Sequence, residues 1–165
     1  MELGETVCLP GGIPDCAGCP LADTCRAAPE ELWRTLPVLP PKKPRRQEER
    51  TVFLLVCGDR LALRKRPPTG LLAGLWELPG VEGALSPAQV LAQAEAWLCA
   101  PRGEPVRRDR SHAFTHVEWT MAGYRVECAA APADFVWATR QELGTRYALP
   151  TAFRQFLADA ALPEA

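Results

Sequence analysis

A proline-rich basic segment divides the chain into two parts of unequal size. Residues 37–50, PVLPPKKPRRQEER, contain four prolines, which deny the segment a helix and favour an extended, semi-rigid connector. Five cations against two glutamates also give it a local positive charge. We therefore expect a small N-terminal region over 1–36, a linker over 37–50 and a larger domain over 51–165.

The bulk composition excludes several classes of protein. With 47% hydrophobic and 24% charged residues, the chain is typical of a globular rather than a disordered protein. Its net charge of −1 gives no overall signal for nucleic acid, so any such surface needs local clustering. No apolar run approaches a membrane span and the start lacks the features of a signal peptide, so we expect a cytoplasmic protein that binds no membrane.

Four cysteines lie close together near the start of the chain. Cys8, Cys16, Cys19 and Cys25 have the spacing C-x7-C-x2-C-x5-C. Structural zinc usually takes two close Cys or His pairs, whereas this segment contains only one. A compact loop that wraps four thiolates around an iron–sulfur cluster is the alternative. The spacing alone leaves an iron–sulfur cluster, zinc and free thiols open.

The larger region reads as short strands interrupted by helices. Apolar and alternating runs predict strands over 51–57, 61–66 and 135–139, and two strands joined by a glycine-containing turn within 114–128. Helical patterns predict helices over 28–36, 86–99 (capped by Ser86) and 150–160, with a capping box from Thr139 to Glu142. This order predicts an α/β (α+β) fold, a mixed β-sheet flanked by helices. Buried, inert thiols are expected at Cys57, Cys99 and Cys128.

Five stretches of the chain carry a family resemblance. They are LGETVCLPGGIPDCAGCPLADTC, LPVLPPKKPRRQEERTVFLL, RPPTGLLAGLWELPG, HAFTHVEW and YALPTAFRQFL. In this order they resemble the C-terminal portion of the bacterial MutY family of adenine DNA glycosylases, enzymes of base excision repair. The resemblance implies a small iron–sulfur loop, a linker and a Nudix-like domain.

The resemblance also implies particular cofactors and partners. It assigns a 4Fe-4S cluster to Cys8, Cys16, Cys19 and Cys25, although the first gap has seven residues where the family typically has six. It implies duplex DNA carrying 8-oxoguanine paired with adenine as the ligand, and a monomer as the oligomeric state. The adenine-cleaving helical domain of the family precedes the cysteines and is absent from this chain. We expect the chain to need that domain as a partner and to be catalytically inactive alone.

Lesion recognition in the family falls to a Phe-Ser-His loop, which matches Phe114, Thr115 and His116 here. Oxidation turns guanine N7 into a donor and adds a carbonyl at C8, and a hydroxyl both donates and accepts. Thr115 keeps the hydroxyl of the family serine and adds a methyl group that stiffens χ1. Without the resemblance, the same residues read as a strand start with Phe114 in the core and His116 solvated.

Basic residues of the linker suit contacts with the DNA backbone. These candidates are Lys42, Lys43, Arg45 and Arg46, and the stretch before the loop adds Arg107, Arg108 and Arg110. An ordinary solvated linker is the simpler interpretation.

Two other functions compete with lesion recognition. The segment GLWELPG also precedes the metal-binding box of Nudix diphosphohydrolases, which needs several glutamates on one helix. Only Glu95 falls on the expected helix in either register of that box, so we expect a Nudix-like fold without hydrolase activity. The alternatives are a nucleotide diphosphohydrolase with a metal-binding tail, and a zinc-bound interaction module.

Overall fold

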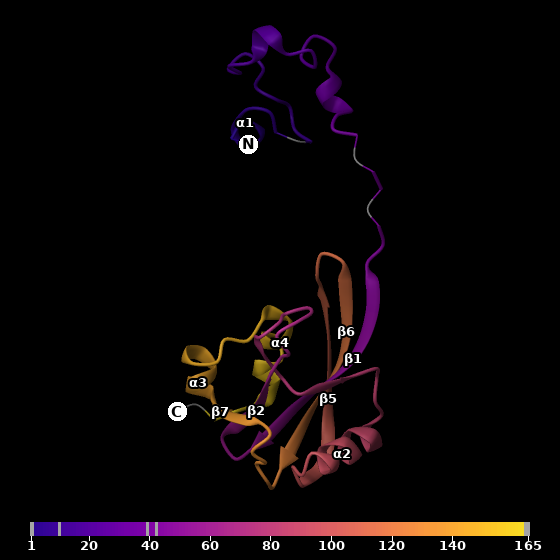
Figure 1. The fold of residues 1–165 in the computed structure, drawn as a ribbon, viewed down its shortest axis with the longest axis vertical. Coiled ribbons are helices and arrows are strands. Elements are labelled where there is room, and N and C mark those ends of the chain that lie inside the picture. The colour runs from indigo at the N-terminus through magenta and orange to yellow at the C-terminus, as the bar shows by residue number, and fades with distance from the viewer. Residues whose placement is uncertain (1, 10, 39, 42, 164–165) are drawn as a thin grey trace. The chain divides into compact units, whose positions relative to one another are not determined.

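The computed structural model describes residues 2–9, 11–38, 40–41 and 43–163. The chain divides into two compact units, Met1–Lys43 and Pro44–Ala165. Figure 1 shows the fold of each unit. No helix in the described part of the chain is long and apolar enough to cross a membrane.

The first unit has little regular structure. Its elements are the helix α1 (Leu3–Thr6) and two 3-10 helices, η1 (Ala22–Thr24) and η2 (Leu32–Arg34). None of its described residues is buried. The helix expected over 28–36 is reduced to η2, because Glu31 adopts a left-handed conformation with φ of 49° that a continuous helix does not tolerate.

The second unit is built on one seven-stranded sheet with the main order β3-β2-β1-β6-β5. The strands are β1 (Arg46–Cys57), β2 (Arg60–Lys65), β3 (Trp76–Glu77), β4 (Gly80–Glu82), β5 (Pro101–Ala113), β6 (Val117–Cys128) and β7 (Val136–Thr139). The central strands β1 and β6 run parallel, whereas the other pairs are antiparallel. This mixed sheet confirms the predicted fold class.

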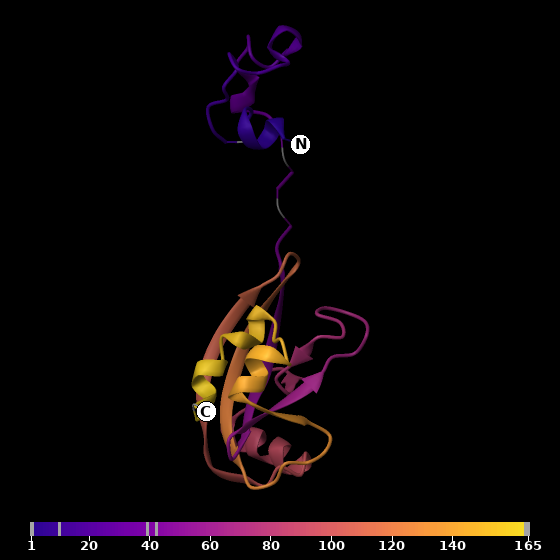
Figure 2. The same ribbon diagram turned by 90° about the vertical axis from the view of Figure 1, so that its left-hand side faces the viewer.

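Helices cover both faces of this sheet (Figure 2). On one face α2 (Pro87–Ala96) packs through Val90 and Ala94 against a cluster that includes Phe53 and Tyr124. On the other face lie α3 (Arg140–Thr145), α4 (Thr151–Arg154) and the 3-10 helix η3 (Leu157–Ala160). Their apolar side chains join a second cluster around Trp119.

Several local predictions are confirmed. The β1–β2 hairpin turns through Gly58 and Asp59, with Val56 paired to Leu61. Ser86 and Gln89 form a capping box for α2, and Thr139 and Glu142 do the same for α3. Cys99 and Cys128 are buried as predicted, whereas Cys57 is only half-buried. Burial raises the pKa of Cys99, and it raises that of Cys128 to about 12, so both thiols stay protonated and unreactive.

Two helix predictions need correction at their ends. The helix α2 stops at Ala96, and Leu98 beyond it has a φ of 60° and is 71% exposed, so it does not join the apolar face expected over 86–99. The segment 150–160 forms α4 and η3 rather than one helix. Its predicted inward side chains nevertheless reach the core: Phe153, Phe156 and Ala160 are buried, and Leu157 packs against them.

The prediction of two strands within 114–128 is wrong. Residues 117–128 form the single strand β6, whose antiparallel partner is the unpredicted β5. The apolar pattern changes phase along β6 because both of its faces are buried: Trp119 and Met121 face one cluster, and Tyr124 and Val126 face the other. The glycine interpreted as a turn, Gly123, lies inside the strand.

Substitution of Gly123 by alanine should destabilise the second unit. A Cβ there would lie 2.4 Å from Cε1 of Phe156 and 2.5 Å from the carbonyl oxygen of Arg108, so strand or helix must shift. We expect a loss of about 1–3 kcal/mol in the free energy of unfolding, measured by denaturant titration. Gly144→Ala in α3 meets no atom within 4 Å and serves as the control. Equal stabilities of the two variants would contradict this packing.

Candidate functional site

The three residues matched to the family's recognition motif form the turn between β5 and β6, called here the 114–116 loop. The N–H of Phe114 donates to the carbonyl of Val117 at 2.7 Å and closes the turn. Phe114 is half-buried, whereas Thr115 and His116 are exposed. The loop therefore presents a hydroxyl and an imidazole to solvent at the end of the β5–β6 hairpin.

Phe114 anchors this loop to the domain core. Its ring meets the buried Trp119 edge-on, with centroids 4.9 Å apart, and the ring of His112 at 4.6 Å. Such edge-to-face pairs add to the free energy gained by burial alone. Phe114 thus packs within the domain, as the simpler sequence interpretation holds, and the exposed chemistry of the loop belongs to its two neighbours.

The start of β1 holds the same loop from its other side. The Arg45 Nε donates to the carbonyl of Phe114 at 2.9 Å, and the backbone N–H of Arg46 donates to the carbonyl of His116 at 3.0 Å. The parallel register pairs Arg46 with Val117, which brings the end of the linker beside the loop. Two of the predicted DNA-backbone residues therefore contact the predicted recognition residues directly.

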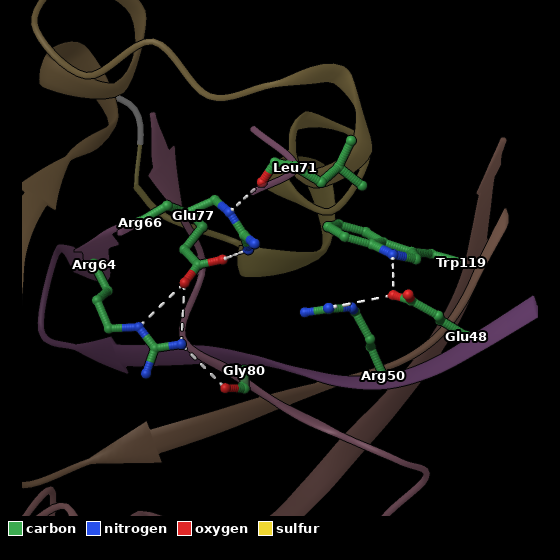
Figure 3. A network of polar contacts seen from close by, with 8 residues as sticks. All are labelled: Glu48, Arg50, Arg64, Arg66, Leu71, Glu77, Gly80 and Trp119. Atoms are coloured by element: carbon green, nitrogen blue, oxygen red, sulfur yellow. Dashed lines mark hydrogen bonds and ion pairs between the residues drawn. The ribbon is translucent and has the colours of Figure 1, made fainter. Parts of the chain in front are cut away.

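Behind Phe114, Trp119 is fixed by polar contacts to β1 (Figure 3). Its indole Nε1 donates to Glu48 Oε2 at 2.8 Å, and the Arg50 guanidinium carbon lies 4.2 Å from the ring centroid. The Arg50 Nε is buried and has no hydrogen-bond partner among the described residues, so the ring face takes the place of one. The recognition loop thus rests on a tryptophan whose orientation is set by β1.

Glu48 carries its negative charge at the centre of these contacts. Burial opposes ionisation, but hydrogen bonds from the Trp119 indole and from two arginines together outweigh it and lower the pKa of Glu48. The arginines are Arg46 and Arg50, the second at 3.3 Å. Glu48 therefore stays ionised to a lower pH than an isolated glutamate does.

A second ionic group lies beside this one, around the buried carboxylate of Glu77 (Figure 3). Arg64 approaches Glu77 to 3.0 Å and Arg66 forms a second ion pair with it, while the Arg66 Nε donates to the carbonyl of Leu71 at 2.9 Å. These side chains line a cavity of about 270 Å³ together with Glu82. Because both oxygens of Glu77 are occupied by guanidinium groups, this carboxylate is not available to a divalent cation.

The helix that would carry the metal-binding box also lacks the necessary acids. The only acidic residue of α2 is Glu95, which is exposed. One carboxylate does not build a magnesium site, which needs several oxygen ligands. The helix α2 therefore does not supply the set of carboxylates that the Nudix box requires.

The arginines before the loop are already paired. Arg107 contacts Asp109 at 2.9 Å, and Arg108 and Arg110 both contact Asp159, at 3.3 and 2.6 Å. These aspartates compensate much of the positive charge on β5. Of the linker cations, Lys43 and Arg45 are exposed and Lys42 lies outside the described residues.

Three successive turns bring the cysteines of the first unit together. The N–H of Cys19 donates to the carbonyl of Cys16, that of Ala22 to Cys19, and that of Cys25 to Ala22. Asp15 supports the first turn by accepting the Gly18 N–H at 3.1 Å. The chain therefore coils tightly through the C-x2-C-x5-C part of the pattern.

All four cysteines of this pattern line one cavity of about 40 Å³, with Val7, Pro14, Asp15, Ala22 and Ala28. Partial burial, followed by the neighbouring thiols of Cys25, Cys8 and Cys19, raises the pKa of Cys16. No set of three or more His, Cys, Asp or Glu side chains in the described ranges is placed to hold a single metal ion. The thiols thus surround a common space without converging on one point.

Comparison with known proteins identifies the second unit. The family model described as a NUDIX domain matches residues 51–159. The chain belongs to the NUDIX domain family. The match covers the sheet from within β1 through η3, so the 114–116 loop and the Glu77 cavity both belong to the NUDIX domain.

Curated relatives of the whole chain are adenine DNA glycosylases. The Arabidopsis thaliana protein is 41% identical over 95 residues, which cover 49% of this chain and 15% of that protein. The human protein is 27% identical over 212 aligned positions, which cover 94% of this chain and 38% of that protein. The chain spans between 15% and 42% of the length of the relatives it matches.

A solved structure shows which part of these relatives the chain resembles. It is similar to the C-terminal domain of mouse MUTYH, crystallised with human PCNA, with a TM-score of 0.54 and 25% identity over 68% of this chain and 86% of that one. The predicted resemblance to the C-terminal portion of an adenine DNA glycosylase is confirmed.

Sequence reasoning missed the residues that support the loop. The sequence assigns Glu48 to the linker and Trp119 to an ordinary strand, and it predicts that Arg45 binds the DNA backbone but not that it contacts the loop, since these contacts cross about seventy positions of sequence. The sequence offers one clue to Glu48: it lies just before the apolar run 51–57, and β1 extends from that run back to Arg46. Only the parallel pairing of β1 with β6 makes these residues neighbours.

The Glu48 contacts predict an acid-sensitive contribution to stability. Because the pKa of Glu48 is lowered by folding, its stabilisation is present at neutral pH and is lost as the pH falls through the folded-state value. We expect the free energy of unfolding of Glu48→Gln to fall less between neutral and acidic pH than that of the unsubstituted protein. Glu95→Gln, at an exposed position of α2, is the control. Parallel pH profiles for all three proteins would contradict the assignment.

Proposed function

We propose that the chain is the lesion-recognition part of an adenine DNA glycosylase and binds duplex DNA containing 8-oxoguanine opposite adenine. The observation that carries the proposal is the 114–116 loop, which exposes Thr115 and His116 on a hairpin braced by Phe114 and Trp119. Support comes from the similarity to adenine DNA glycosylases and to the MUTYH C-terminal domain. The place of action is base excision repair.

The chemistry of the lesion matches the groups that the loop offers. The Thr115 hydroxyl accepts a hydrogen bond from N7–H of 8-oxoguanine, a donor that guanine lacks. A hydroxyl also donates to ordinary N7, so a fixed donor is needed for discrimination. Within the described chain the N–H groups of Thr115 and His116 have no hydrogen-bond partner, which leaves them available to the C8 carbonyl. Phe114 holds the backbone from which they project.

Contacts between cationic side chains and the phosphates of the DNA backbone supply the remaining affinity. Exposed Arg45 and Arg46 supply positive charge at the start of the domain, and Lys42 and Lys43 precede them in the sequence. Each phosphate neutralised releases condensed counterions and adds salt-dependent affinity. Adenine removal belongs to a preceding helical domain of the same enzyme, which is the protein partner we assign to this chain, and no catalytic residue is assigned here.

We assign a 4Fe-4S cluster to Cys8, Cys16, Cys19 and Cys25. A cluster binds each thiolate at a different iron, so its ligands surround a volume rather than meet at one ion. Four thiols around one cavity suit that requirement, and the turns through Cys16, Cys19 and Cys25 suit a tight wrap. Because none of the described residues of this unit is buried, the cluster would supply the cross-links that order it.

A nucleotide diphosphohydrolase is less well supported. That reaction requires carboxylates free to hold magnesium, whereas Glu77 is neutralised by Arg64 and Arg66 and α2 offers only Glu95. Magnesium-dependent release of pyrophosphate from oxidised dGTP would favour this alternative over ours.

Lesion recognition predicts a preference that Thr115 controls. The chain should bind a duplex with 8-oxoguanine opposite adenine more tightly than the same duplex with guanine, measured by fluorescence anisotropy. We expect Thr115→Ala to narrow this ratio roughly fivefold, the value of one net hydrogen bond. Thr115→Ser, which restores the hydroxyl, should recover it. An unchanged ratio in Thr115→Ala would remove Thr115 from the recognition of the base.

The cluster assignment predicts the metal content of anaerobically prepared protein. Iron and acid-labile sulfide should be present in equal amounts, and Cys19→Ser should lower both together. Cys57→Ser, outside the pattern, should retain them. Unfolding of the NUDIX domain should not respond to cluster loss, because its core contains none of the four cysteines. Zinc in place of iron and sulfide would refute the assignment.

A further inference from the structure

We propose that Arg45 couples DNA-backbone binding to the conformation of the recognition loop: its Nε holds the Phe114 carbonyl while its terminal nitrogens bind a phosphate. The inference rests on the function proposed above and deepens it. It makes Arg45 a positioning residue for lesion recognition as well as a phosphate contact.

The hydrogen bonding of Arg45 permits both roles at once. A guanidinium has five N–H donors in one rigid plane, and the bond of 2.9 Å to Phe114 uses the single donor on Nε. The four donors on the terminal nitrogens form the edge that binds phosphate oxygens in pairs. Because the plane is rigid, a phosphate that orients this edge also orients the Nε, and through it the loop carbonyl.

The charge of Arg45 is also available to an external anion. Arg46 pairs with Glu48, and Arg107, Arg108 and Arg110 pair with aspartates. In the part of the chain that the structure describes, Arg45 has no carboxylate within ion-pairing distance, and its contact is with a neutral carbonyl. Its full positive charge therefore remains available next to the exposed Thr115 and His116.

Other contacts hold the two ends of the loop. The ring of Phe114 packs on Trp119, and the Arg46 N–H holds the carbonyl of His116 through the backbone. Between these two fixed points, the peptide that joins Phe114 to Thr115 is held by the Arg45 side chain. The orientation of this peptide sets the direction of the Thr115 N–H, the donor assigned above to the C8 carbonyl.

Two substitutions of Arg45, by lysine and by alanine, separate the effect of its charge from the effect of its planar shape. Arg45→Lys keeps the positive charge but replaces the planar fork by a point charge, which does not hold a carbonyl and a phosphate in fixed relation. Lys43→Ala removes an exposed linker charge two positions away from Arg45 in the sequence and serves as the matched control. Arg45→Ala removes charge and geometry together.

Each variant of the full chain is titrated with the lesion duplex and with its undamaged counterpart over a range of salt concentrations. We expect Arg45→Lys to lower the preference for the lesion about fivefold while keeping the salt dependence. Lys43→Ala should weaken binding to both duplexes equally and reduce the salt slope by about 0.9. Arg45→Ala should show both effects.

Backbone amide shifts of Thr115 and His116 in the free protein report the loop conformation without DNA. They should move in Arg45→Lys and stay in place in Lys43→Ala, with the rest of the NUDIX domain spectrum unchanged. An Arg45→Lys protein that keeps the lesion preference, or unmoved loop amides, would overturn the inference. Failure of the unsubstituted chain to prefer the lesion would overturn the proposed function instead, and the amide shifts would still test the positioning.

Discussion

The parallel pairing of β1 with β6 is the constraint on which the rest of the NUDIX domain depends. It joins Arg46–Val56 to Val117–Glu127 without a break in register. The central parts of both strands, Thr51–Val56 and Met121–Tyr124, are buried on both faces, so the pairing divides the core into two clusters that the helices cover. Because the strands run in the same direction, the linker that leads into β1 and the recognition loop that leads into β6 lie at the same end of the sheet.

The sequence predicts elements best where one local pattern dominates. The β1–β2 hairpin has apolar runs around a Gly-Asp turn, and α2 has a serine cap followed by proline. The edge strand β5 escapes prediction because its exposed side chains include several charged arginines and give no apolar alternation. In β6 the alternation of apolar residues shifts by one position near Gly123, which looks like a turn in the sequence. The shift arises because the strand is buried on both sides there, and the glycine is required by the close approach of Phe156.

The candidate site is predictable only in part for a similar reason. Motif matching finds the 114–116 loop, but it does not find Glu48, whose contact with Trp119 depends on strand register. Nor does it show that Phe114 faces inward. Residues that contact a ligand tend to form local motifs. Residues that position those ligand-contacting side chains can lie far away in the sequence and become neighbours only in the folded domain.

The cavity around Glu77 shows how one scaffold accommodates a different chemistry. In this domain the carboxylate forms ion pairs with Arg64 and Arg66, and Arg66 in turn fixes the carbonyl of Leu71. A buried pair of this kind is costly to break, since removing either partner leaves a charge without compensation. A glutamate of the kind that could bind a metal therefore holds Arg66 here, and Arg66 in turn stabilises the β2–β3 loop.

The early start of β1 has a consequence for how the domain is delimited. Family similarity begins at residue 51, within the strand, whereas the strand itself begins at Arg46 and its side-chain contacts begin at Arg45. A protein cut at the family boundary would keep the sheet core and lose every linker-side support of the recognition loop. The smallest transferable unit thus includes the last residues of the linker. Swapping domains between relatives at residue 51 would transfer the recognition loop without the Arg45 and Arg46 contacts that hold it.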